Sequence, residues 1–208
     1  MFRFRFFYIF ILYMKKASNY RKDSIVASRF ETETILLFMG KYSNDLKNVY
    51  VWADNKPRPE YDIKIIDKFN NTARIEVKAQ TIYNKFNDYF FIEYEQNGVN
   101  SGINSTESDI YHIYKIDKND RIKLHNHLNF GHKLDHIDYT LYMIPTNMIR
   151  YIIEHEKDKI IFSDYGDQKG GSKGWKIPIR LFENPTIFKS SIDENINLHN
   201  EKIIRILK

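Results

Sequence analysis

The clearest pattern of hydrophobic and polar positions lies in two short runs joined by a polar turn. The runs 62–66 and 73–78 are rich in β-branched residues, and residues 67–72 between them carry the Asp and Asn that hairpin turns favour. We therefore predict two paired strands. Because side chains alternate along a strand, Glu76 and Lys78 share one face, and the residues that flank Glu76 enter a core on the other.

The rest of the chain alternates between helical and extended patterns. A helix is predicted over residues 23–38, where apolar residues recur at helical spacing. Further helices are predicted to open at Thr106 and Thr146, whereas the polar segment 117–138 is typical of a solvated loop. Additional strands are predicted over 49–52, 89–95, 139–145 and 175–182. This order predicts an α/β protein with a mixed sheet.

Composition narrows the classes of function. The chain has 208 residues, which is enough for one domain with a sizeable core. The absence of cysteine excludes disulfides, zinc–thiolate sites and iron–sulfur clusters. A chain without cysteine fits the reducing cytoplasm, or the cytoplasm of the host cell if the protein is viral. The formal net charge of +5 permits nucleic acid as a partner without identifying it.

Three segments divide the chain. Residues 1–20 form an apolar extension, and its run 2–14 is shorter than the about 20 residues that span a bilayer, so we predict no membrane segment. This run is predicted to be an added strand or an extended tail, the alternatives being a membrane-facing tail or an upstream start before Met14. Residues 21–182 are predicted to be the functional domain, and residues 183–208 a tail or short helix.

The predicted hairpin places an acid on one strand and Glu-x-Lys on the next. Asp62 and Glu76 supply the hard oxygen donors that Mg²⁺ prefers, and Mn²⁺ is expected to substitute. Such an ion stabilises charge on phosphoryl oxygens, and the Lys78 ammonium can orient a water or neutralise developing charge. The pattern predicts phosphodiester hydrolysis, although Asp, Glu and Lys also alternate on solvated strand faces.

With these residues the chain resembles the PD-(D/E)XK nuclease superfamily, in particular its phage and mobile-element endonucleases. Three further segments carry the resemblance: Phe91-Ile-Glu-Tyr-Glu95, the segment 101–109 with Ser108 where alanine is usual, and a loop rich in glycine and lysine before Trp175-Lys-Ile-Pro. The resemblance covers residues 20–182. It implies a restriction-endonuclease-like αβββαβ core with a mixed central sheet flanked by helices.

The resemblance also implies roles for single residues of the hairpin. Asp62 and Glu76 would bind the metal together with the Val77 carbonyl, and Lys78 would orient or activate the water. The proline that often directly precedes the acid in this superfamily stands three residues before Asp62 here. Glu60 is therefore the alternative ligand.

Several other polar residues have two interpretations each. Glu31 lies in the apolar stripe of the first helix. It is either the acid that this superfamily often takes from that helix, with Glu33 as a substitute, or a stripe-edge residue paired with a base. Glu93, on the strand predicted to lie beside Glu-x-Lys, either reaches the metal site or stays on the surface. Gln80 either positions the substrate or caps the sheet edge.

Phosphate contacts are predicted at two loops. Ser105 and Thr106 offer hydroxyls and backbone N–H groups that suit a phosphate, or they form an ordinary capping box. The second loop either holds the DNA backbone or is a flexible surface segment, and its residues are Lys169, Ser172, Lys173 and Lys176. The histidines within 117–138 allow a zinc site, with a solvated loop as the default.

Together these features predict a Mg²⁺-dependent DNA endonuclease. Cutting both strands of a duplex at once takes two active sites, which predicts a homodimer or a larger assembly. Two alternatives stay open: a catalytically inactive protein of the nuclease fold that binds nucleic acid, and an RNA endonuclease that uses the same metal chemistry.

Overall fold

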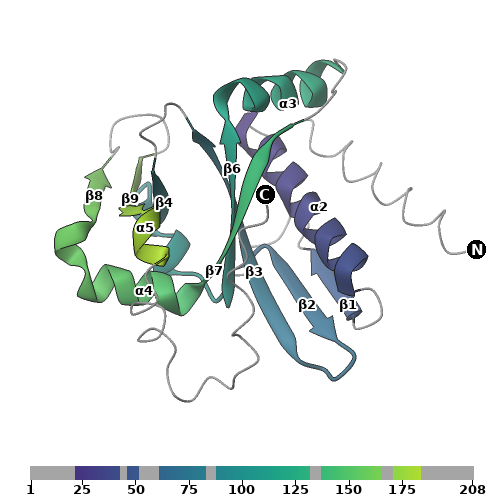
Figure 1. Ribbon diagram of the computed structural model, residues 1–208, viewed down its shortest axis with the longest axis horizontal. Coiled ribbons are helices and arrows are strands. Elements are labelled where there is room, and N and C mark those ends of the chain that lie inside the picture. The colour runs from purple at the N-terminus through teal and green to yellow at the C-terminus, as the bar shows by residue number, and fades with distance from the viewer. Residues whose placement is uncertain are drawn as a thin grey trace, which may run out of the picture.

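The computed structural model describes residues 22–42, 46–51, 61–82, 88–131, 137–164 and 171–183. The predicted extension 1–20 lies outside these ranges, as do the tail beyond Glu183, Glu60 and Lys169. The described residues form an α/β fold built on two sheets (Figure 1).

The first sheet, sheet A, has five strands in the order β1-β2-β3-β6-β7. β3 and β6 run parallel, and the other neighbours run antiparallel. The predicted mixed central sheet flanked by helices is therefore confirmed. Its strands are β1 (Leu46–Val51), β2 (Ile63–Asp67), β3 (Thr72–Ile82), β6 (Ile110–Asp117) and β7 (Tyr139–Pro145).

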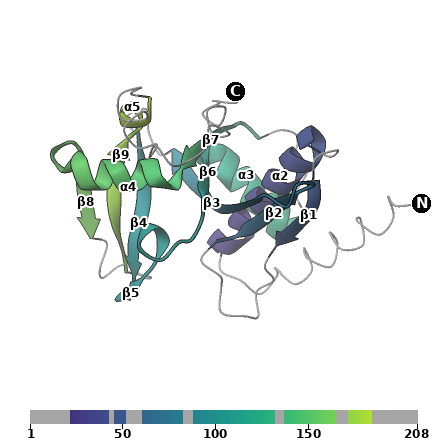
Figure 2. The same ribbon diagram turned by 90° about the horizontal axis from the view of Figure 1, so that it is seen from below.

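The second sheet, sheet B, is antiparallel with the order β5-β4-β9-β8. It lies with α4 (Thr146–His155) and α5 (Ile179–Phe182) at the opposite end of the molecule from α2 (Lys22–Tyr42), as Figures 1 and 2 show. Its strands are β4 (Tyr89–Gln96), β5 (Val99–Asn100), β8 (Ile161–Asp164) and β9 (Ser172–Pro178). The prediction that β4 lies beside the Glu-x-Lys strand was wrong, because β6 occupies that place.

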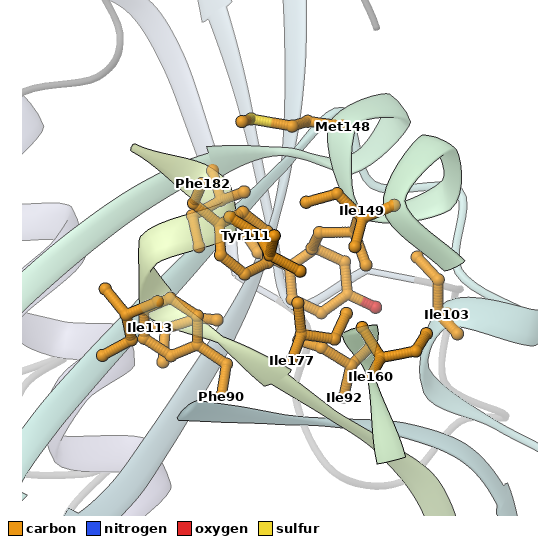
Figure 3. Packing of buried hydrophobic residues seen from close by; sticks show 14 residues of the cluster. Phe90, Ile92, Ile103, Tyr111, Ile113, Met148, Ile149, Ile160, Ile177 and Phe182 are labelled. Atoms are coloured by element: carbon orange, nitrogen blue, oxygen red, sulfur yellow. The ribbon is translucent and has the colours of Figure 1, made fainter. Parts of the chain in front are cut away.

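β3 separates two hydrophobic cores. Ile75 and Val77 point towards α2 and pack in one core with Val26 and Phe30. On the other face of sheet A, Tyr111 belongs to a core that it shares with sheet B, α4 and α5 (Figure 3). Side chains that alternate along β3 therefore enter two different environments.

Three predicted elements differ from the structure, and one of them is the strand predicted over 175–182, which ends at Pro178 where α5 begins. The helix expected to open at Thr106 is replaced by a short 3₁₀ helix, η2 (Gly102–Asn104), a loop and strand β6, because the Ile- and Tyr-rich run of β6 favours an extended backbone. The segment predicted as a solvated loop contains α3 (Lys118–Phe130). The Asp117 carboxylate caps this helix by accepting the Asn119 N–H at 2.7 Å.

Gly102 allows η2 to approach β4 closely. Its φ is +53°, and a Cβ added there would lie 2.3 Å from the Glu93 carbonyl oxygen. Gly98, in the turn between β4 and β5, also has a positive φ of +78°, but a Cβ there would meet nothing within 4 Å. The two glycines therefore separate the cost of the backbone conformation from the cost of a steric clash.

We predict that Gly102→Ala lowers the free energy of unfolding clearly more than Gly98→Ala does. Both substitutions carry the left-handed backbone penalty of about 1–2 kcal/mol, and only Gly102→Ala adds a clash with a strand backbone. Urea unfolding of both variants measures the difference. Equal losses would show that η2 moves away from β4 at no cost.

His112 lies in a buried polar cluster between α2 and sheet A. Its Nδ1 is 3.4 Å from Thr34 Oγ1, which lies 2.8 Å from the Tyr114 hydroxyl. The imidazole stacks on Phe38 with the ring centroids 5.7 Å apart. Burial lowers the pKa of His112 to about 4, so the folded protein holds this imidazole neutral at pH 7.

We predict that the protein loses stability on acidification from pH 7 to pH 4.5 partly through His112. In this pH interval His112 binds a proton in the unfolded chain and stays mostly neutral in the folded chain. The free energy of unfolding therefore falls as pH falls. The lost contribution is about 2 kcal/mol. Urea unfolding at both pH values should show a loss smaller by this amount in His112→Phe, which keeps a ring against Phe38. An identical loss in both proteins would contradict the prediction.

Candidate active site

The pairing of β2 with β3 places Asp62 beside Glu76. Asp62 directly precedes β2, whose first residue, Ile63, pairs with Ile75, the residue before Glu76. The Asp62 N–H donates to the Ile75 carbonyl at 3.0 Å, and Asp62 Oδ2 accepts from the Val77 N–H at 2.8 Å. These two hydrogen bonds fix the Asp62 carboxylate against β3.

Glu76 and Lys78 form an ion pair on the same face of β3. Glu76 is 8% exposed, and Lys78 Nζ lies 2.6 Å from Glu76 Oε1. Burial acts to lower the pKa of Lys78, but the carboxylates of Glu76 and Asp62 outweigh it and raise the pKa above its ordinary value. Lys78 is therefore an ammonium at neutral pH, within electrostatic range of both acids.

The two acids form a pair rather than a larger cluster. Within the ranges that the structure describes, no group of three or more His, Cys, Asp or Glu side chains is arranged to hold a metal ion. Carboxylates from adjacent strands still match the preference of Mg²⁺, which uses one or two carboxylates and keeps several waters. A metal at this position would be held mainly by Asp62 and Glu76.

Glu31 lies on the helix side of sheet A. It follows Phe30, which packs in the α2 core with Ile75 and Val77, and it is half-buried. Glu76 and Lys78 leave β3 on the opposite face. Glu33, the substitute for Glu31, forms an ion pair with Arg29 one helical turn away. The structure thus brings Asp62, Glu76 and Lys78 together and leaves the α2 acids on the other side of the sheet.

Gln80 joins the two sheets. Its amide Nε2 donates to the Phe91 carbonyl at 2.6 Å, and its Oε1 accepts from the Phe91 N–H at 3.1 Å. Both groups belong to the backbone of β4, so this side chain bonds the edge of β4 as a neighbouring strand would. Gln80 had two interpretations, positioning the substrate or capping a sheet edge. In the structure its amide lies at a strand edge.

Lys115 supports the same junction and was not predicted from the sequence. It pairs with Gln80 across β3 and β6, is 4% exposed, and donates from Nζ to the Tyr89 carbonyl. Burial lowers the pKa of Lys115 to about 8, opposed by the nearby Asp88 carboxylate. The feature of the sequence that could have identified Lys115 was a single lysine within the apolar run of β6.

We predict that Gln80→Ala lowers the free energy of unfolding by about 2–4 kcal/mol, because it removes both hydrogen bonds that the Gln80 amide makes with the Phe91 main chain. Gln96→Ala is the matched control, since Gln96 is exposed on β4. It should change stability by about 0.5 kcal/mol or less. Thermal unfolding followed by circular dichroism measures both, and equal effects would contradict the role of Gln80 at the junction.

Thr106 lies inside the protein rather than on a phosphate-facing surface. It is 6% exposed, and its Oγ1 donates to Ser108 Oγ at 2.9 Å and accepts the Ser108 N–H at 3.0 Å. Ser108 Oγ lies 3.2 Å from Thr146 Oγ1, so the three hydroxyls form a buried chain. Ser105 is half-buried at the end of η2. The Thr106 side chain thus supports the loop from within.

The Glu93 carboxylate accepts hydrogen bonds from two serines, one in β9 and one directly before η2. Ser101 Oγ donates to Oε1 at 2.8 Å, and Ser172 Oγ donates to Oε2 at 3.0 Å. Both Glu93 and Ser172 were predicted near the metal or the substrate. In the structure their contacts connect β4, β9 and the segment before η2.

The segment rich in glycine and lysine is partly a strand. Gly174 lies in β9, and a Cβ added there would approach the Ile92 carbonyl oxygen to 2.4 Å, so this glycine allows tight packing against β4. Lys173 pairs with Glu95 at 2.8 Å, and Lys176 Nζ lies 5.5 Å from the centre of the Tyr89 ring. Lys169 is outside the described residues. A DNA contact by Lys173 would require it to leave Glu95.

The comparisons with known proteins give no relative. No family model, no curated protein and no solved structure matches this chain. Within the described ranges, no helix is both long enough and apolar enough to cross a membrane. The interpretation of the site therefore depends on its geometry and chemistry.

Proposed function

We propose that this protein is a Mg²⁺-dependent DNA endonuclease that hydrolyses phosphodiester bonds. The observation that supports the proposal is the arrangement of three side chains on one face of sheet A. The Asp62 carboxylate accepts the N–H of Val77, the residue after Glu76, and the Lys78 ammonium lies 2.6 Å from Glu76. Two acids that could hold a divalent ion, with a cation beside them, suit metal-assisted attack on a phosphodiester.

Asp62 and Glu76 would hold the ion, joined by the Val77 carbonyl, and Mn²⁺ should replace Mg²⁺. When bound, such an ion supplies positive charge that stabilises the phosphoryl oxygens. The ligands at this position fit Mg²⁺, because hard carboxylate oxygens favour this ion and no thiolate is present in the chain. The Asp62 carboxylate is already fixed by the Val77 N–H, which limits the entropy lost on binding.

Lys78 acts as a cation in this proposal rather than as a general base. As an ammonium ion-paired with Glu76, it can donate hydrogen bonds to the attacking water or to a phosphate oxygen. The buried Glu76 holds the ammonium in place before substrate arrives. Negative charge that develops on the phosphate during attack would meet a positive charge already in position.

DNA is the proposed substrate, and a homodimer or larger assembly would allow both strands to be cut. RNA cleavage by the same chemistry and binding without cleavage are the alternative outcomes. Supercoiled, linear and branched DNA, together with single- and double-stranded RNA, should be offered in Mg²⁺ and in EDTA. Binding in EDTA without turnover in either metal would identify a protein that binds nucleic acid and does not cut it.

We predict that Glu76→Gln and Lys78→Ala each reduce cleavage of supercoiled plasmid by about 10³-fold or more, because the first removes a metal-binding carboxylate and the second removes a cation that would face the phosphate. Binding of DNA should change far less. Glu154→Gln and Lys118→Ala are matched controls on exposed helix positions and should cleave at the parental rate. Cleavage at the parental rate by both site variants would overturn the nuclease proposal, provided that they remain folded by circular dichroism.

A further inference from the structure

Arg74 connects the loop before β6 to the face of sheet A that carries Glu76. Arg74 stands two residues before Glu76 on β3, so both side chains leave the same face. The Arg74 guanidinium lies 3.0 Å from a Glu107 carboxylate oxygen and 3.1 Å from one of Asp109. Thr106 directly precedes Glu107, which places its main chain beside the candidate active site.

Several hydrogen bonds hold the Thr106 main chain in place. The Thr106 N–H donates to the Gly102 carbonyl at 2.8 Å, and the Thr146 N–H donates to the Asp109 carbonyl at 3.0 Å. The buried hydroxyl chain from Thr106 through Ser108 to Thr146 connects this loop with the start of α4. The Thr106 carbonyl is therefore a fixed acceptor next to the site.

Arg150 uses that acceptor. It is exposed on α4, and its Nη2 donates to the Thr106 carbonyl at 2.9 Å. Among the residues that the structure describes, no carboxylate forms an ion pair with Arg150, whereas Arg74 nearby lies between two carboxylates. A guanidinium has five N–H donors, so Arg150 keeps several for a ligand while one of them fixes its orientation.

Tyr111 is the buried residue of β6 that lies next to Glu76 in the sheet. Tyr111 pairs with Glu76 across β3 and β6 and is 1% exposed, with its ring among Ile103, Ile149 and Ile177 (Figure 3). Burial and the Glu76 charge raise the pKa of Tyr111, while Lys78 and Arg150 act to lower it. These three charges therefore act on one hydroxyl.

We propose that Arg150 contacts a backbone phosphate of the DNA strand that enters the site of Asp62, Glu76 and Lys78. This inference rests on the proposed function and adds a substrate-binding residue on α4. The planar guanidinium matches two phosphate oxygens, which a lysine cannot do. Its bond to the Thr106 carbonyl orients the side chain in advance, so less conformational entropy is lost when DNA binds.

Binding is measured first, without cleavage, in the Glu76→Gln background. A fluorescent 30-base-pair duplex in EDTA is titrated at several salt concentrations. Adding Arg150→Gln should weaken binding about tenfold and reduce the slope of log K against log salt by about one, as loss of one phosphate contact predicts. Arg150→Lys should keep the salt slope and bind with intermediate affinity. Arg180→Gln removes the same charge from an exposed position on α5 and should stay within about twofold of its parent.

Kinetics then place the contact in the reaction. In the otherwise unchanged protein, Arg150→Gln should raise KM for plasmid about tenfold with a smaller change in kcat, because it weakens substrate binding more than chemistry. If the parent cleaves DNA and Arg150→Gln matches Arg180→Gln in affinity, salt slope and KM, the Arg150 proposal fails and the nuclease proposal stands. If the parent neither binds nor cleaves DNA, both fail. Thermal unfolding checks the fold of each variant, and Arg150→Lys decides the question if Arg150→Gln is unfolded.

Discussion

Strand β3 is the constraint on which the rest of the structure depends. Its side chains alternate between two environments, so Ile75 and Val77 complete the core under α2 while Glu76, Lys78 and Gln80 project from the opposite face. A shift of one residue in the pairing with β2 would exchange these two sets and bury charge under α2. The position of the candidate site is therefore tied to the register that also gives the protein its core.

The second consequence of β3 is the attachment of sheet B. Gln80 and Lys115 lie side by side on β3 and β6, and they satisfy backbone groups of β4 at Phe91 and Tyr89. Both side chains are polar groups at a buried junction, where an unpaired donor or acceptor is costly. Satisfying the β4 backbone in this way fixes where sheet B stands relative to the face that carries Glu76.

Electrostatics connect this architecture with the proposed chemistry. Glu76 and Asp62 together raise the pKa of Lys78, so the site contains a positive charge, ion-paired with Glu76, before any ligand arrives. Arg150 adds a second cation that is oriented by a backbone carbonyl rather than neutralised by an acid. A polyanion approaching this face would meet charges that are already oriented, and preorganised charge is the form in which proteins stabilise phosphoryl groups most effectively.

The sequence by itself determined the hairpin, the long first helix, the strand 139–145 with the helix after it, and the shared face of Glu76 and Lys78. These follow from local periodicity and turn residues. It did not determine α3, a polar helix in which Leu124 is buried and Ile122 is exposed, or the strand β6, which lies where a helix was predicted. Only the tertiary structure decided that β6 rather than β4 lies beside β3, and that Gln80, Glu93 and Thr106 bond within the protein. Pairings between strands far apart in the chain are set by packing and by satisfaction of buried polar groups, which leave no periodic trace in the sequence.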